Sequence, residues 1–177
     1  MKDLGLSNLI TLSRGVLAVP LFLLILEGNF HLASVVFALG VISDLLDGPM
    51  ARTCREASSL GGFLDHSCDA LFVATGFLAL SASGAETSFL AGLIVVSFFE
   101  YGWGFITAGN PLHSTVLGRF NGISYYVLLG CWLTLSTAEL YISIDYKSIL
   151  TSCSRFLCCT TLLAIIMGIY RRLIVKV

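Results

Sequence analysis

Four aspartates stand in two pairs, each at helical spacing, within one short stretch of the chain. Asp44 and Asp47 are three residues apart, and Asp65 and Asp69 are four apart. Because residues three or four apart share one face of a helix, each pair would present its carboxylates in the same direction. If the two helices pack side by side, four negative charges meet in a small volume and need cations to stay ionised. The pattern predicts a metal site of oxygen ligands, which favours Mg²⁺ or Mn²⁺ and suits two ions.

The residues around these aspartates complete a longer pattern, D-x2-D-G-x2-A-R-x8-G-x3-D-x3-D. Its specified positions are Asp44, Asp47, Gly48, Ala51, Arg52, Gly61, Asp65 and Asp69. With every gap matched, the pattern resembles the signature of the CDP-alcohol phosphotransferase family of membrane phospholipid synthases. The resemblance implies transfer of a substituted phosphate group from a CDP-linked donor, usually CDP-diacylglycerol, to an alcohol with release of CMP.

Composition places the chain in a membrane. Hydrophobic residues make up 56% of the 177 residues, and the mean hydropathy of +0.91 is far above that of a soluble domain. The net charge is −1, and the absence of a basic stripe argues against nucleic acid as a partner. We therefore predict an all-α integral membrane protein with a single domain over residues 1–177.

Six apolar segments of about 20 residues, each long enough to cross a bilayer, follow one another along the chain. They are predicted at about 8–27, 30–50, 61–82, 88–108, 120–137 and 149–170. A short amphipathic juxtamembrane segment over residues 1–14 leads into the first. The second segment carries Asp44 and Asp47 in its last turns, and the third carries Asp65 and Asp69 in its first turns. Both aspartate pairs are therefore expected on the same side of the membrane.

The basic residues predict which side this is, because cytoplasmic loops carry an excess of Lys and Arg. If both termini are cytoplasmic, only Lys147 and Arg155 fall outside. The other basic residues then lie inside, namely Lys2, Arg14, Arg52, Arg55, Arg119, Arg171, Arg172 and Lys176. We expect a multi-pass protein of a bacterial or archaeal plasma membrane, with both termini and the active site cytoplasmic.

The family resemblance implies roles for individual residues of the signature. The four aspartates would hold two metal ions against the pyrophosphate, and Asp69 would also act as the base for the alcohol. Gly48 and Ala51 would let the nucleotide approach the helix, and Arg52 would bind a phosphate. Ser58, just outside the signature, would also contact the cytidine diphosphate. The resemblance further implies a homodimer surrounded by membrane lipids.

Near the start of the chain, Asn8, Thr11 and Arg14 form the pattern N-x2-T-x2-R. This pattern resembles the beginning of the first span in many family members. Asn8 and Thr11 are candidates to hydrogen-bond the nucleotide from the membrane surface. The alternative interpretation is simple helix capping by Ser7 or Asn8.

Three further polar residues have open roles. His66 lies between the aspartates in sequence but off their helix face, which favours a structural role over metal binding. Glu100 is a carboxylate inside the fourth segment, where acids are costly and often functional. It either shapes the alcohol pocket or forms an ion pair with Arg14 or Arg119. Arg119 itself is a candidate to bind a phosphate of the acceptor or of lipid headgroups.

The acceptor alcohol decides the product, and the sequence favours glycerol 3-phosphate only slightly. The chain length and the N-x2-T-x2-R pattern resemble bacterial phosphatidylglycerophosphate synthases, which typically carry Lys where this chain has Ala70. The phrase LDHSCDAL resembles the choline and ethanolamine branch instead. Inositol phosphate and serine also remain possible acceptors.

A hypothesis from a different class of function is divalent-cation transport. A small membrane carrier would move the ions through the four acids, because intramembrane carboxylates also mark ion pathways. This hypothesis gives Gly48, Ala51 and Gly61 no role. It also places Arg52 where its charge would repel the cation. A non-catalytic scaffold of the same fold is a third hypothesis, but it predicts the loss of at least one signature acid, and none is missing.

Overall fold

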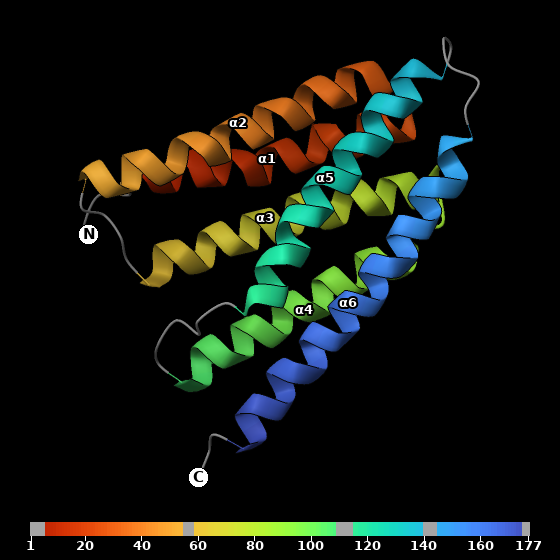
Figure 1. The fold of residues 1–177 in the computed structure, drawn as a ribbon. Coiled ribbons are helices and arrows are strands. Elements are labelled where there is room, and N and C mark those ends of the chain that lie inside the picture. Colours follow the sequence, from red (N-terminus) through yellow and green to blue (C-terminus); the bar gives the residue numbers. More distant parts are fainter. Residues whose placement is uncertain (1–5, 55–58, 109–114, 140–144, 175–177) are drawn as a thin grey trace.

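The computed structural model describes residues 6–54, 59–108, 115–139 and 145–174. Within these ranges the secondary structure is helical throughout, so the all-α prediction is confirmed for this part of the chain (Figure 1). The helices are α1 (Leu6–Leu26), α2 (Phe30–Cys54), α3 (Ser59–Ala82), α4 (Ser88–Ala108), α5 (Val116–Ala138) and α6 (Tyr146–Ile174). Each of the six predicted segments falls on one of these helices, with ends that differ by a few residues. The helix α1 already begins at Leu6, so its first turns take up much of the predicted juxtamembrane segment.

Local sequence signals explain where several helices begin and end. Gly28 has a φ of +73°, the left-handed conformation that glycine adopts at the end of a helix. Asn29 then caps α2, because its Oδ1 accepts a hydrogen bond of 3.3 Å from the amide of Leu32. Thr115 caps α5 in the same way, with its hydroxyl 3.0 Å from the amide nitrogen of Gly118.

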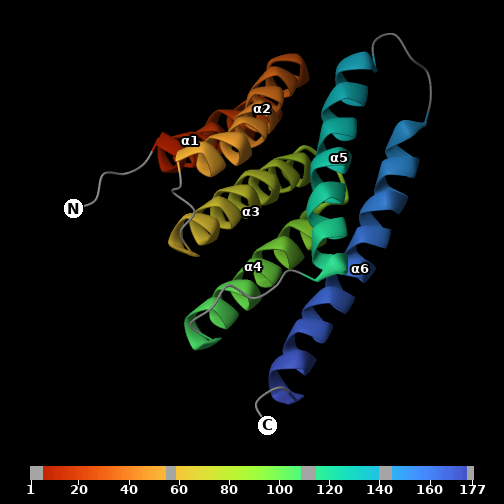
Figure 2. The same cartoon turned by 60° about the vertical axis from the view of Figure 1, so that its left-hand side comes forward.

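Successive helices run in opposite directions, so one end of the bundle contains the helix ends that carry or adjoin the aspartate signature. The first turns of α1, α3 and α5 and the last turns of α2, α4 and α6 lie at this end (Figures 1 and 2). Helix α3 is central: it packs against α1, α4 and α5, while α6 contacts α4 and α5. The end of α2 and the beginning of α3, which carry the aspartate pairs, are thereby brought to the same end of the bundle.

Close approach of the helices depends on small residues, as in many membrane proteins. The core between α3 and α5 contains the fully buried side chains of Phe77, Leu129 and Leu133. A Cβ atom placed on Gly76 would lie 2.6 Å from the Leu129 side chain, which is closer than real contacts allow. Glycine at this position is therefore what lets α3 and α5 touch.

The outer surface is apolar, as membrane contact requires: Leu23, Leu39 and Ile166 are among many exposed large hydrophobic residues. Within the described residues, Gly61–Ala82 and Tyr146–Ile174 are long and apolar enough to cross a bilayer, and shorter apolar stretches lie in α1, α2 and α4. Two helices meeting this test give weak support for a membrane location. The prediction of six spans goes further and stays a prediction.

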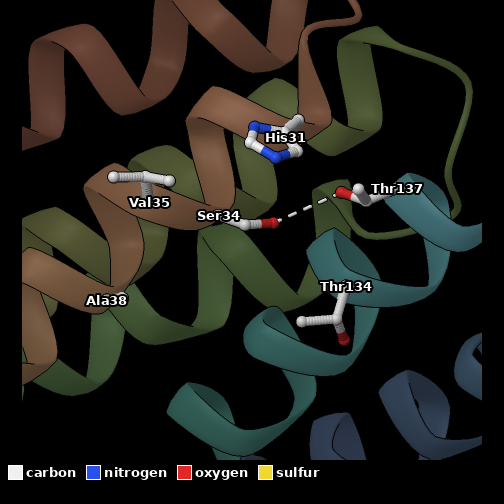
Figure 3. Close-up of a pocket in the computed structure, with 6 residues that line it drawn as sticks. All are labelled: His31, Ser34, Val35, Ala38, Thr134 and Thr137. Carbon is white, nitrogen blue, oxygen red and sulfur yellow. Dashed lines mark hydrogen bonds between the residues drawn. The ribbon is translucent and has the colours of Figure 1, made fainter.

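At the opposite end of the bundle an open pocket of about 290 Å³ lies between α2 and α5 (Figure 3). It is lined by His31, Ser34, Val35, Ala38, Thr134 and Thr137. The hydroxyls of Ser34 and Thr137 are 3.4 Å apart and link the two helices across it. None of these lining residues is an acid, so the pocket offers no carboxylate chemistry.

Candidate active site

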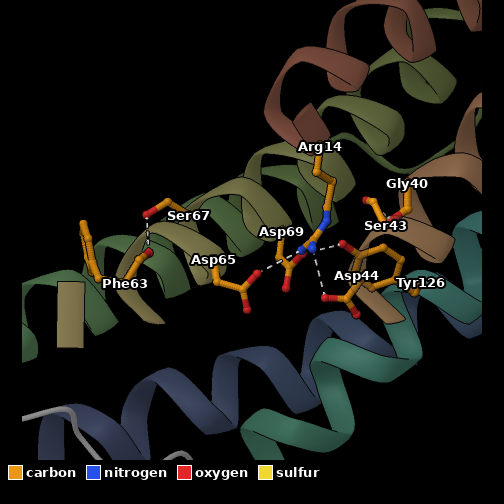
Figure 4. Close-up of polar contacts among 9 residues, drawn as sticks. All are labelled: Arg14, Gly40, Ser43, Asp44, Phe63, Asp65, Ser67, Asp69 and Tyr126. Carbon is orange, nitrogen blue, oxygen red and sulfur yellow. Dashed lines mark hydrogen bonds and ion pairs between the residues drawn. The ribbon is translucent and has the colours of Figure 1, made fainter. Parts of the chain in front are cut away.

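An arginine from α1 draws the two halves of the aspartate signature together (Figure 4). Nη2 of Arg14 lies 3.1 Å from Oδ1 of Asp44 on α2. Its Nη1 lies 3.3 Å from Oδ1 of Asp65 and also contacts Oδ1 of Asp69, both on α3. The side chain of Arg14 is 0% exposed, so its charge has to be balanced by neighbouring groups such as these carboxylates. Three helices are thereby joined at one point.

The helix geometry explains why these carboxylates meet. Asp65 and Asp69 are one turn apart on α3 and share the face that contacts α1. On α2, Gly40 lies one turn before Asp44, and a Cβ atom there would come 2.6 Å from the ring of Phe72 on α3. The missing side chain at position 40 leaves room for the ring of Phe72 against the backbone of α2, and Asp44, one turn further on, reaches the other two acids.

The described acids fit a divalent metal ion. Asp44, Asp65 and Asp69 each offer an oxygen, and these three oxygens lie within 4.8 Å of one another. Their side chains are between 28% and 44% exposed, so an ion can reach them. One guanidinium against three carboxylates leaves an excess of two negative charges, which a hard divalent cation matches. The side chain of Asp47 lies outside the described residues.

Asp69 has a second partner that was not expected from the sequence. The hydroxyl of Tyr126, on α5, donates a hydrogen bond of 2.8 Å to Oδ1 of Asp69. No sequence signal identifies Tyr126, which is one of two adjacent tyrosines in an apolar helix. From the sequence, Arg14 was expected as a cytoplasmic charge, as part of the N-x2-T-x2-R pattern and as a candidate partner of Glu100, but not as a partner of the aspartates. The need of four clustered acids for cations was a signal that could have pointed to this contact.

The other predicted site residues on the described helices lie at the same end of the bundle. Thr11 is buried on α1, one turn before Arg14 and on the same helix face. Asn8 belongs to the first turns of α1, and Gly48, Ala51 and Arg52 belong to the last turns of α2, with side chains outside the described residues. Ser58 itself lies outside the described residues.

His66 is turned towards α4 and away from the carboxylates. Its ring centroid lies 4.4 Å from that of Tyr101 and 6.1 Å from that of Phe98. It is absent from the group of described side chains that can hold a metal ion. This arrangement agrees with the structural role predicted for His66.

Glu100 forms an ion pair, but with a different arginine from those predicted. Arg172, near the end of α6, contacts Oε1 of Glu100 and donates a 2.5 Å hydrogen bond to its backbone oxygen. The predicted partners, Arg14 and Arg119, were wrong. Glu100 lies on the face of α4 that packs against α6 at Gly168, one turn before Arg172, whereas Arg14 is held by the aspartates.

The fold and the site together define a helical protein with an apolar surface and a carboxylate centre suited to a divalent cation. A family profile described as CDP-alcohol phosphatidyltransferase matches residues 4–170. The match covers nearly the whole sequence, and the chain belongs to the CDP-alcohol phosphatidyltransferase family.

Named relatives cover parts of the chain. A probable cardiolipin synthase (CMP-forming) of Drosophila melanogaster is 35% identical over 101 residues, which are 56% of this chain and 31% of the relative. The CDP-diacylglycerol–glycerol-3-phosphate 3-phosphatidyltransferase of Pseudomonas fluorescens is 37% identical over 81 residues, 44% of this chain and 41% of the relative. The inner membrane protein YnjF of Escherichia coli is 36% identical over 100 residues, 56% of this chain and 47% of the relative. The chain thus spans about a third to a half of the length of these relatives.

Proposed function

We propose that this protein transfers a phosphatidyl group from CDP-diacylglycerol to an alcohol and releases CMP, a step of membrane phospholipid synthesis. The observation that carries the proposal is the convergence of Asp44, Asp65 and Asp69 around one buried arginine. Membership of the family and the names of relatives that form CMP or use CDP-diacylglycerol support the same reaction.

The four signature aspartates would hold the metal, with Mg²⁺ or Mn²⁺ as the ion and two ions as the expected number. When bound, such ions neutralise the charge of a pyrophosphate and of the departing CMP. The three described acids support this assignment, because they are hard oxygen donors with an unbalanced negative charge. Arg14 keeps these acids close together.

Asp69 acts as the general base in the proposed reaction. The hydroxyl proton of the alcohol moves to Asp69 as the alcohol oxygen forms a bond to the phosphorus that carries the diacylglycerol. The bond between this phosphorus and the bridging oxygen of CMP breaks, and its electron pair leaves with CMP. Asp69 then returns the proton to water. Its side chain, 28% exposed, is open to both exchanges.

Residues around the acids would bind the nucleotide. We assign this role to Gly48, Ala51, Arg52 and Ser58 after α2, and to Asn8 and Thr11 on α1, as the family resemblance implies. The position of Thr11 supports the assignment, because it lies one turn from Arg14 at the aspartate end of the bundle.

For the acceptor we favour glycerol 3-phosphate, the alcohol named for the Pseudomonas relative. Inositol phosphate, serine, choline and ethanolamine are the alternatives. Ala70, where phosphatidylglycerophosphate synthases typically carry Lys, means that a phosphorylated acceptor must find its cations elsewhere on this side of the membrane.

We also propose six membrane spans, both termini and the active site on the cytoplasmic side, and a homodimer surrounded by lipid. The gathering of the aspartates at the end of the bundle that begins α1 and ends α6 supports this topology. The distribution of basic residues supports the cytoplasmic assignment of that end.

The test is CMP release by the purified protein in detergent with CDP-diacylglycerol and Mg²⁺, with each acceptor supplied alone. One acceptor should drive CMP release, and EDTA should stop it. Failure of every acceptor, together with Mn²⁺ transport into liposomes, would replace the enzyme by a cation carrier. The fixed positive charge of Arg14 among the acids argues against that outcome, because it opposes the passage of a cation.

A further inference from the structure

The two oxygens of the Asp69 carboxylate have different surroundings. Oδ1 accepts a hydrogen bond of 2.8 Å from the Tyr126 hydroxyl and contacts Nη1 of Arg14. Among the described residues, none donates a hydrogen bond to Oδ2. The two donors come from different helices, α5 and α1, so they approach Oδ1 from separate directions (Figure 4).

We propose that Tyr126 is a positioning residue, which holds Oδ1 of Asp69 so that Oδ2 is presented to the hydroxyl of the acceptor. This inference rests on the proposed function and deepens it. A carboxylate rotates easily about its last side-chain bond, so an unconstrained Asp69 would present either oxygen in many orientations. Two donors on one oxygen fix that rotation, and a base aligned in advance speeds proton transfer.

Tyr126 is itself held in place by aromatic rings from two other helices. Its ring centroid lies 6.2 Å from that of Phe37 on α2 and 6.3 Å from that of Phe72 on α3. These two phenylalanines stack on each other with centroids 6.1 Å apart. The three rings form one cluster at the junction of α2, α3 and α5, a geometry that aromatic side chains favour.

Glycines close this cluster from two sides. A Cβ atom on Gly40 would lie 2.6 Å from the ring of Phe72, and one on Gly130 would lie 3.0 Å from the ring of Phe37. The backbone of α2 therefore lies close to the ring of Phe72 and that of α5 close to the ring of Phe37, and these are the two rings that contact Tyr126. The hydroxyl of Tyr126 is fixed by packing before any substrate binds.

The neighbouring Tyr125 provides a matched control. Its hydroxyl lies 2.5 Å from that of Thr161 on α6, in the buried core and away from the acids. Tyr125→Phe and Tyr126→Phe thus remove the same atom from the same helix, and each breaks one hydrogen bond between helices. Only the second change affects Asp69.

The kinetic test compares these two variants in CMP release. Tyr126→Phe should lower kcat by roughly ten- to a hundredfold, the effect of one hydrogen bond to a charged group, with KM for donor and acceptor within about threefold of the wild type. Tyr125→Phe should keep kcat within about twofold. Equal losses of kcat in both variants, or a change confined to KM, would overturn the proposal.

Two further measurements do not depend on turnover. Mn²⁺ affinity, titrated by electron paramagnetic resonance, should fall less in Tyr126→Phe than in Asp69→Ala, because loss of a hydrogen bond to a ligand affects metal binding less than loss of the ligand itself. Tyr126→Phe should lower the melting temperature of the wild type but not that of Asp69→Ala, whereas Tyr125→Phe should lower both. Equal lowering by Tyr126→Phe in both backgrounds would exclude the contact with Asp69. A wild type that releases no CMP would refute the proposed function instead, whatever the melting temperatures show.

Discussion

Two arginines bind carboxylates at the same end of this protein, and they do so in opposite ways. Arg14 is fully buried and meets three acids that remain partly exposed. Arg172 meets the single acid Glu100, and the two side chains are only 23% and 18% exposed. The first centre keeps an excess of negative charge and an open side, whereas the second is balanced and closed.

The difference shows that burial of an arginine does not by itself identify a functional site. The pair of Glu100 and Arg172 balances its own charge, and it joins α4 to α6. The Arg14 centre cannot satisfy itself, because one guanidinium faces several carboxylates. The unbalanced negative charge is what suits this centre to hold a divalent cation.

The largest expected effect on CMP release comes from changing an aspartate of the Arg14 centre. Asp69→Asn should lower CMP release by roughly a thousandfold, because it removes the proposed general base while keeping the shape of the side chain. Divalent metal binding should be partly kept, since Asp44 and Asp65 remain. Unchanged turnover in this variant would exclude Asp69 as the base.

Removing the buried cation should give the next largest effect. Arg14→Ala should destabilise the metal-free protein by about 3 kcal/mol, because it leaves several acids without their shared partner. Mg²⁺ should restore more stability to this variant than it adds to the wild type, since the cluster is then more negative. Thermal unfolding with and without Mg²⁺ measures both. Arg172→Gln is the control, and an equal response of both variants to Mg²⁺ would contradict the assigned role of Arg14.

The ion pair of Glu100 and Arg172 should contribute to stability and not to catalysis. Glu100→Gln keeps one hydrogen-bond acceptor but removes the charge opposite Arg172, at a cost of roughly 1–2 kcal/mol. The value of kcat should stay within about threefold. A large loss of kcat with normal thermal stability would show instead that Glu100 belongs to the acceptor pocket.

The exposed ion pair of Lys147 and Glu139, at the other end of the bundle, should give the smallest effect. Lys147 and Tyr146 donate hydrogen bonds of 2.6 and 2.8 Å to Glu139, and they lower the pKa of that carboxyl group below its usual range. Its contribution to stability is therefore present above the ordinary Glu pKa and is lost as the pH falls through the lowered value. Glu139→Gln should shift the melting temperature only slightly at neutral pH and not at all in acid, which calorimetry at both pH values can check.

The sequence predicted the elements of this protein better than the contacts between them. Helical spacing was enough to pair Asp65 with Asp69, because both lie on one helix and the period is fixed. The predicted segments 8–27 and 30–50 also placed the break between α1 and α2 at Gly28, whose conformation few other residues adopt.

What could not be predicted depends on how helices far apart in the chain pack together. Tyr126 is 57 residues from Asp69, and Arg172 is 72 residues from Glu100. Both contacts follow from the rotation of one helix against another, which is set by close approaches such as that at Gly76. Apolar helices with little difference between their faces give almost no sequence signal for that rotation.

The triple contact of Arg14 has a consequence for how the chain is made. Synthesis delivers α1 before α2 and α3, so the acids that balance its arginine follow later, with Asp65 and Asp69 coming 51 and 55 residues further on. Until they arrive, a charged side chain in an apolar segment is costly inside the bilayer. We therefore expect α1 to stay near the membrane surface during translation until α3 has emerged, so that α1 takes its final place only after two later helices have been made.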